Sequence, residues 1–414
     1  MKLVLKFYPV LNQNQISIIE ELSFHTIKLY NIANYECKEK EYKNYHTLEQ
    51  ELKTNWHKAY LHSHTYQHCL KMVEQDWKSY FASIKDYRKN PQKYKGIPQP
   101  PKYKHLEKRK NDIIFTNLAI RKRGASLLLS LSKKMQEKFE VDSLKVEIPK
   151  SFPLPTDARM QQIRIQYDRQ RKQWVFLIIY QVEEKEEIVN TNVMSIDLGL
   201  DNLATITFSH HIDIYIICGR SLKSLNGYIN KRIASLQGIR MKQVGSESFK
   251  NTKQINDLRA YRHDYMMNYL HKASRSIIQL AQKYDVSTIV VGDMKGIKHE
   301  NHAKTFVQVP LQKLPTLIDY KAKLDGRKLV YQEESYTSGV SALDLEPISN
   351  KSYNKSRRYK RGLFRTNGGL VIHADVNGSL NIMRKYLKDT CTPKLIEIVW
   401  DNGCVSHPQR IRVA

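Results

Sequence analysis

Two aspartates, Asp197 and Asp375, stand where predicted strands end, and such positions suit metal-assisted chemistry. Asp197 closes the apolar run of the segment MSIDLGL, and Asp375 lies at a strand-to-helix junction in HADVNGSLNI. Carboxylates at the ends of neighbouring strands supply the oxygen ligands that Mg²⁺ or Mn²⁺ prefers. Two such ions about 4 Å apart can activate a water and stabilise the leaving oxygen of a phosphodiester. Each aspartate alone can be structural, since an acid before a helix is a common N-cap, but together they predict a metal site.

The elements around these acids predict a mixed sheet covered by helices. Strands are expected over 193–197, 203–207 and 213–218, and the tripeptide 219–221 that follows them is interpreted as a turn. A long helix with an apolar face from Leu258 to Ile277 comes next, then a strand (288–291), a helix (311–324), a strand (328–334) and a last helix after Asp375. Three strands in succession followed by alternating helices and strands match the order of an RNase H-like fold.

The first half of the chain has a different pattern. A strand is expected over 2–9, helical spacing over much of 13–104, and short strands over 112–118, 143–148, 162–168 and 173–181 around a helix at 127–139. We therefore predict a small β-barrel made of residues 1–12 and 105–186, interrupted by a helical insert at 13–104. The fold class expected for the whole chain is multidomain, with this β part followed by an α/β domain at 187–414.

Composition points to a polyanionic partner. The chain has 68 Lys and Arg against 41 Asp and Glu, a formal charge of +27, and nucleic acid is the usual partner of such an excess. No apolar stretch approaches the roughly 20 residues that span a bilayer, so no membrane association is expected. The five cysteines include no Cys-x-x-Cys pair, so neither a disulfide framework nor a zinc site is expected.

The motifs resemble one known family. MSIDLGLDNLATIT resembles the first RuvC motif of TnpB, the transposon-encoded OrfB proteins related to type V CRISPR effectors, and HADVNGSLNIMRKYL resembles the third. Segment 305–344 resembles the region between these motifs, and KLYNIANYE is also typical of the family. The resemblance implies a wedge-like barrel with a helical recognition insert, then a RuvC nuclease domain. It also implies a metal-dependent endonuclease that a transposon-derived guide RNA directs to double-stranded DNA beside a short flanking motif, in the prokaryotic cytoplasm at the nucleoid.

One catalytic position departs from the family pattern. The second RuvC motif normally has a glutamate at the end of its strand, whereas this strand reads IVVGD with Gly292 at that position. A glutamate at the end of an adjacent strand, about 4.8 Å away, could replace it; Glu334 is preferred and Glu333 is the alternative. Asp293 is a further candidate, but it is shorter and should face the other side of the sheet.

The expected catalytic set is therefore Asp197, Asp375 and either Glu334 or Glu333, with Asp197, Glu334 and Asp375 as the metal ligands. Without a replacement glutamate, the chain would be a nuclease-inactive, RNA-guided DNA-binding repressor. A transposase-associated protein that uses the same fold and acids to join strands is the third interpretation.

A basic segment lies before the third motif. Many relatives have four cysteines in this interval, but residues 339–372 contain none, so no zinc is expected here. The segment is instead rich in cations, and we predict that five of them contact nucleic acid. They are Arg357, Arg358, Lys360, Arg361 and Arg365.

Overall fold

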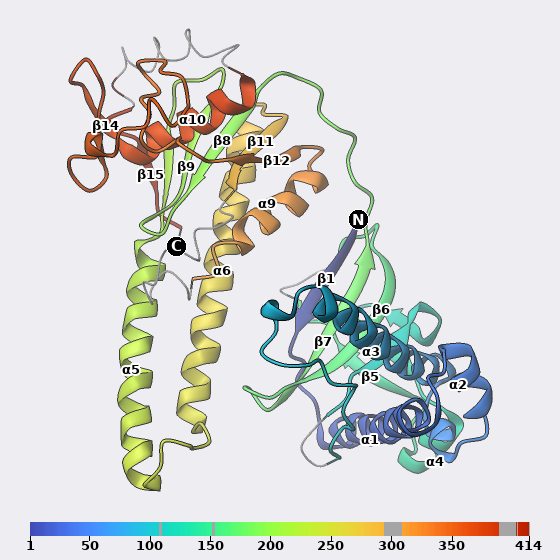
Figure 1. Ribbon diagram of the computed structural model, residues 1–414. Helices are drawn as coiled ribbons and strands as arrows, with labels where there is room; N and C mark the ends of the chain where they lie inside the picture. Colours follow the sequence, from blue (N-terminus) through green and yellow to red (C-terminus); the bar gives the residue numbers. More distant parts are fainter. Residues whose placement is uncertain (107–109, 151–153, 294–308, 389–402, 404, 414) are drawn as a thin grey trace. The chain divides into compact units, whose positions relative to one another are not determined.

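The computed structural model describes residues 1–106, 110–150, 154–293, 309–388, 403 and 405–413. The chain divides into two compact units, Met1–Glu183 and Glu184–Ala414, and each is described by itself (Figure 1). The boundary lies three residues from the position 186/187 that the sequence predicts. Among the described residues, no helix has both the length and the hydropathy that crossing a membrane requires.

The strands of the N-terminal unit form two antiparallel sheets. The first has the order β1 (Lys2–Phe7), β7 (Gln173–Gln181), β6 (Arg159–Asp168) and β2 (Ile113–Thr116). The second consists of β3 (Ile120–Arg123), β4 (Ser126–Ser130) and β5 (Ser143–Glu147). The expected pairing of the first strand across the helical segment is confirmed, because β1 pairs with β7. Closure into one barrel stays a prediction.

The helix predicted in this unit is wrong over its first half. Of the predicted helix at 127–139, only α4 (Lys133–Phe139) is helical, and the earlier part is strand β4. Leu127 and Leu129 are both fully buried while their neighbours are partly exposed, which is the alternation of a strand. Pairing of β4 with both β3 and β5 satisfies its backbone and decides between the two conformations.

Helices α1 (Gln13–Tyr35), α2 (Tyr45–Glu51) and α3 (Ser63–Lys89) complete the N-terminal unit. Asn12 starts α1 with a capping box, in which its side chain accepts from the Gln15 amide and the Gln15 side chain accepts from the Asn12 amide. Leu22 and Leu70 from the helices share one buried core with Phe115 and Phe176 from the strands. The helical insert therefore packs with the strands as one body rather than standing apart from them.

The C-terminal unit is built on a six-stranded mixed sheet. Its order is β12 (Lys328–Glu333), β11 (Thr288–Asp293), β8 (Val193–Leu198), β9 (Asn202–Phe208), β10 (Tyr215–Cys218) and β15 (Gln409–Ile411). Strand β11 runs parallel to β12 and β8, β9 is antiparallel to β8 and β10, and β15 adds to β10 in parallel. The expected mixed sheet is confirmed.

Helices cover both faces of this sheet (Figure 1). Met194 and Ile196 of β8 pack in one core with α6 (Lys253–Lys283) and α9 (Lys313–Leu324). Val193 and Val290 pack with Ile382 of α10 (Ala374–Leu387) on the other face. Because side chains alternate along a strand, residues 197 and 292 belong to the α10 face.

The predicted turn after the third strand is wrong. Helix α5 (Arg220–Val244) begins there and pairs with α6, with Ile229 and Ile233 packed against Ile255. The apolar stripe of α5 is narrow and its other faces are polar and basic, so the sequence carries a weak helical signal. The basic segment contains a small hairpin of β13 (Leu363–Arg365) and β14 (Val371–His373), which leads directly into α10.

Candidate active site

Asp197 lies near the end of β8 with a carboxylate that α10 covers closely. A Cβ atom at position 378 of that helix would lie 2.6 Å from Asp197 Oδ2, so the approach requires Gly378. Burial raises the pKa of Asp197 well above its usual value, and the negative charges of Asp375 and Glu334 raise it further, against a smaller opposing effect of Arg358. A cation bound here would offset the negative charge that burial and the two neighbouring acids make unfavourable.

Asp375 lies in the first turn of α10 but is not the residue that caps it. The cap is His373, whose Nδ1 accepts from the Asp375 amide at 3.3 Å. The Asp375 side chain is thereby left for other contacts. Its Oδ2 accepts a hydrogen bond of 2.7 Å from Asn202 Nδ2, and its Oδ1 lies 3.9 Å from the guanidinium of Arg358.

Glu334 follows the last residue of β12 and turns back over β11. A Cβ atom at position 292 would overlap Glu334 Oε1 and lie 2.5 Å from Glu334 Cδ. The carboxylate therefore occupies the space that a side chain at position 292 would enter. Its Oε1 is buried without a hydrogen-bond partner among the described residues. Burial, assisted by the charges of Asp293 and Glu333, raises the pKa of Glu334 to about 7.

Neither of the two rival acids lines the pocket that holds Asp197 and Asp375. Glu333 is exposed and forms an ion pair of 2.5 Å with Lys385 and accepts a hydrogen bond of 2.6 Å from the Ser335 amide. The Lys385 and Ser335 contacts lower the pKa of Glu333 to about 2. Asp293 alternates with Gly292 along β11 and so belongs to the α6 and α9 face. Of the three candidate replacements, only Glu334 lines the same pocket as Asp197 and Asp375.

Helix α10 also holds the loop that carries Glu334. Asn377 Nδ2 donates to the Val340 carbonyl at 2.8 Å, and Asn377 Oδ1 accepts from the Ala342 amide at 2.9 Å. Asn381 Nδ2 donates to the Thr337 carbonyl at 2.9 Å. Sequence reasoning missed these asparagines, although two amides facing one side of a buried helix were a usable signal. They tie Glu334 and Asp375 to one rigid element.

The three carboxylates line a cavity of about 240 Å³. Its other walls come from the end of β8 and the turn after it, β9, the loop after β12, the basic segment and α10. These residues are Leu198, Gly199, Asn202, Thr337, Ser338, Arg358 and Gly378. The donors are oxygen atoms, and Glu334 Oε1 is unpaired within the described part of the chain, which fits a hard divalent cation. In the described ranges, however, no three Asp, Glu, His or Cys side chains stand close enough to enclose one ion. The donor chemistry fits magnesium, while the ligand set is not closed around a single point.

The five predicted nucleic-acid contacts separate into different roles. Arg357 forms a two-pronged ion pair with Glu346, at 2.5 and 2.8 Å, and both side chains are mostly buried. Arg358 lines the carboxylate cavity, and Arg361 pairs with Asp201 at 2.5 Å. The remaining two, Arg365 and Lys360, lie beside the ring of Tyr359. Arg357 therefore stabilises its own loop, and the other four stay candidates for contact with nucleic acid.

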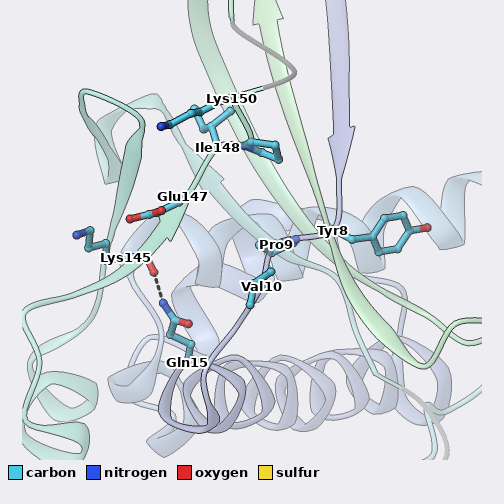
Figure 2. A pocket seen from close by; sticks show the side chains of 9 residues that line it. Tyr8, Pro9, Val10, Gln15, Lys145, Glu147, Ile148 and Lys150 are labelled. Carbon is cyan, nitrogen blue, oxygen red and sulfur yellow. Dashed lines mark hydrogen bonds between the residues drawn. The ribbon is translucent and has the colours of Figure 1, made fainter.

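A second cavity, of about 570 Å³, lies in the N-terminal unit where the β1–α1 connection meets the end of β5 (Figure 2). Gln15 Nε2 donates to the Lys145 carbonyl at 2.6 Å across its floor. Pro9, Val10 and Ile148 add apolar wall, and Glu147 is its one carboxylate among the residues shown. This cavity lacks the acids that metal-assisted chemistry requires.

Comparison with known proteins agrees with this architecture. Residues 177–298 match the family OrfB_IS605, described as a probable transposase, and residues 312–382 match the Cas12f1-like TNB domain. The TnpB-like protein ORF457 of Acidianus two-tailed virus is 24% identical over 403 residues, which cover 89% of this chain and 83% of that protein. The resemblance to TnpB and its OrfB relatives that the motifs indicate is thereby confirmed.

Cas12f nucleases are related as well. The CRISPR-associated endodeoxyribonuclease Cas12f1 of Sulfoacidibacillus thermotolerans is 24% identical over 227 residues, covering 53% of this chain and 52% of that protein. The solved structure of a Cas12f1–sgRNA–target DNA complex superposes with a TM-score of 0.60 at 15% identity, over 90% of this chain and 83% of that one. At this identity the superposition establishes a shared fold of mixed α/β content.

Proposed function

We propose that this chain is an RNA-guided DNA endonuclease encoded by a transposon, with a RuvC site whose glutamate has moved from β11 to the end of β12. The class is supported by the relatives named as TnpB-like proteins and as Cas12f endodeoxyribonucleases. The charge of +27 suits both a guide RNA and a double-stranded DNA target. The proposed partners are therefore a transposon-derived guide RNA and DNA that carries a short flanking motif, in a prokaryotic cell.

The observation that carries the site assignment is the position of Glu334 over Gly292. Asp197, Glu334 and Asp375 would hold Mg²⁺ or Mn²⁺, which would activate water and stabilise the leaving oxygen of a phosphodiester. The chain's own residues prepare this pocket. Gly378 lets α10 cover Asp197, Asn202 orients Asp375, and Arg358 adds a positive charge beside Asp375. Four-cysteine zinc binding is not part of the proposal.

The decisive experiment isolates the chain with its copurifying RNA, sequences that RNA and offers a DNA library that matches the guide. We expect cutting beside one flanking motif, only with Mg²⁺ or Mn²⁺. Asp197→Ala and Glu334→Gln should abolish cutting and keep guide-dependent binding, whereas Glu333→Gln should cut. Cutting by Asp197→Ala at the wild-type rate would refute the site. Strand-joining products formed without guide RNA would favour a transposase instead.

A second function is favoured by one specific observation. Position 292 is glycine, and among the described residues no three acids enclose a single ion. Such a site is compatible with a protein that binds DNA matching its guide RNA without cutting it and thereby represses transcription. The same reaction discriminates the two functions, because the repressor binds the matched target with RNA and leaves the DNA intact at every divalent metal concentration.

A further inference from the structure

A groove lined by four arginines opens beside the carboxylate cavity. Its volume is about 560 Å³, and it shares Gly199, Asn202, Arg358 and Asp375 with that cavity. The arginines come from three separate parts of the C-terminal unit, namely the start of α5 (Arg220), the basic segment (Arg358 and Arg361) and β15 (Arg410). Three segments that are distant in the sequence thus place positive charge in the same groove.

We propose that this groove, hereafter the arginine groove, binds the phosphate backbone of the DNA strand whose next phosphate enters the carboxylate cavity. Guanidinium groups are planar, always charged and able to donate two parallel hydrogen bonds, which suits phosphate oxygens. Four guanidinium groups here face the two carboxylates Asp201 and Asp375. The proposal rests on the proposed nuclease function for the identity of the strand.

The charges are accessible to such a strand. The side chain of Arg361 is 81% exposed, although it also contacts Asp201, which in turn receives Lys223 at 2.8 Å. Arg220 and Arg410 are exposed as well. Asp201 therefore holds one arginine in place through a surface ion pair, an interaction weak enough for a phosphate to share or replace.

Arg410 has a second effect that depends on the C-terminal strand. Strand β15 pairs in parallel with β10, with Arg410 opposite Ile216. From there Arg410 Nη1 donates to Asn202 Oδ1 at 3.2 Å, and Asn202 Nδ2 donates to Asp375 Oδ2 at 2.7 Å. The arginine fixes which end of the amide faces Asp375. Arg410 thus lines the groove and acts as a positioning residue for Asp375 through Asn202.

The test measures binding without divalent metal, so that cutting is not needed. The full chain with its copurified RNA is titrated with fluorescein-labelled oligothymidine at several salt concentrations. We expect Arg220→Gln combined with Arg410→Gln to raise the Kd about tenfold. The plot of log association constant against log salt concentration should become less steep by about 1.4, or about 0.7 for each phosphate that the double variant leaves without a cation. Two matched controls, Arg232→Gln on α5 and Arg412→Gln just beyond β15, should stay within about twofold of wild type.

Three results would overturn the proposal. The first is binding by the double variant within twofold of wild type, and the second is an equal weakening in the two controls. The third is a preference for oligouridine whose binding alone depends on Arg220 and Arg410, because the groove would then belong to RNA. Arg410→Lys keeps the charge and should recover part of the affinity, which separates the effect of charge from the effect of misfolding.

The same measurements distinguish failure of the groove from failure of the nuclease. A chain that binds oligothymidine through these arginines but never cuts a guided target retains the groove and refutes the proposed function. A chain that cuts, while its double variant binds and cuts like wild type, retains the function and refutes the groove. With a cutting protein, a neutral methylphosphonate beside the cut position should slow wild type but not the double variant.

Discussion

The carboxylate of Glu334 occupies the space in front of Gly292, although Gly292 belongs to β11 and Glu334 follows the end of β12. A Cβ atom at 292 would overlap Glu334 Oε1, and Gly292 pairs with Gln332, two residues before Glu334. A glycine on one strand and a glutamate just beyond the next are therefore sterically linked. The Glu334 carboxylate can take this position only because residue 292 has no side chain.

This link predicts that Gly292→Ala displaces Glu334 from the cavity. We expect loss of cutting and a destabilisation of about 1–3 kcal/mol, since the added methyl group overpacks a buried site. The measurement is urea unfolding together with cleavage of a guided target. Gly238→Ala is the matched control, because no described residue outside its own stretch of helix comes within 4 Å of a Cβ atom there. Its helical position should gain about 0.5–1 kcal/mol. Unchanged cutting by Gly292→Ala would contradict the role assigned to Glu334.

The raised pKa of Glu334 predicts a pH dependence of stability. The folded chain holds this proton up to about pH 7, whereas the unfolded carboxyl releases it near the usual value of 4.5. Its contribution to stability therefore falls as the pH rises between these values. Without divalent metal, Glu334→Gln should exceed wild type by on the order of 3 kcal/mol at pH 8 and by little at pH 4.5. Urea unfolding in EDTA at both pH values measures this. Equal differences at the two pH values would refute it.

Metal addition should stabilise wild type through Asp197. At ten times its Kd, a bound Mg²⁺ contributes about 1.4 kcal/mol to unfolding free energy. Asp197→Asn removes a proposed ligand and relieves a buried charge, so it should raise metal-free stability and remove most of the Mg²⁺ response. Thermal unfolding over a magnesium titration measures both effects. Asp257→Asn on α6, where the carboxylate is half exposed, is the control and should respond like wild type. A Mg²⁺ response that survives in Asp197→Asn would count against this site.

Two adjacent arginines should have different effects. Arg357→Ala leaves the mostly buried Glu346 without its ion-pair partner and should cost about 2 kcal/mol in unfolding free energy. Arg358→Ala should change stability by less than about 0.5 kcal/mol. It should nonetheless slow cutting, because Arg358 is the cation beside Asp375. Stability from urea unfolding and the single-turnover cleavage rate separate the two. The reverse pattern would exchange their roles.

Asn202 should act through Asp375 rather than on DNA. Asn202→Ala removes the 2.7 Å hydrogen bond to Asp375 Oδ2 and should raise the Mg²⁺ concentration for half-maximal cutting several-fold. DNA binding by the RNA-loaded chain should change far less than the magnesium dependence. Asn202→Gln keeps the amide group on a longer side chain and therefore tests whether the position of the amide matters. A weaker DNA affinity with no change in magnesium dependence would identify a direct DNA contact instead.

The sequence alone determined the mixed sheet and the two aspartates. Alternating or continuous apolar runs ending in acids identify strands of a sheet, and the motifs around Asp197 and Asp375 are local strings that need no distant contact to be read. The charge of +27 likewise follows from composition. These features depend on neighbours in the chain, so periodicity and motif reading find them.

Tertiary structure decided what depends on packing between distant segments. Strand β4 replaced half of an expected helix because β3 and β5 pair with it, and α5 replaced an expected turn because α6 covers its narrow apolar stripe. The choice between Glu333 and Glu334 was open in sequence, since a change of one residue reverses which side of a strand a side chain faces. The contact of Glu334 with Gly292, its place in the carboxylate cavity and the ion pair of Glu333 with Lys385 separate them. The arginine groove has the same origin, because its arginines lie up to 190 positions apart, from Arg220 to Arg410, and meet only when β15 joins the sheet.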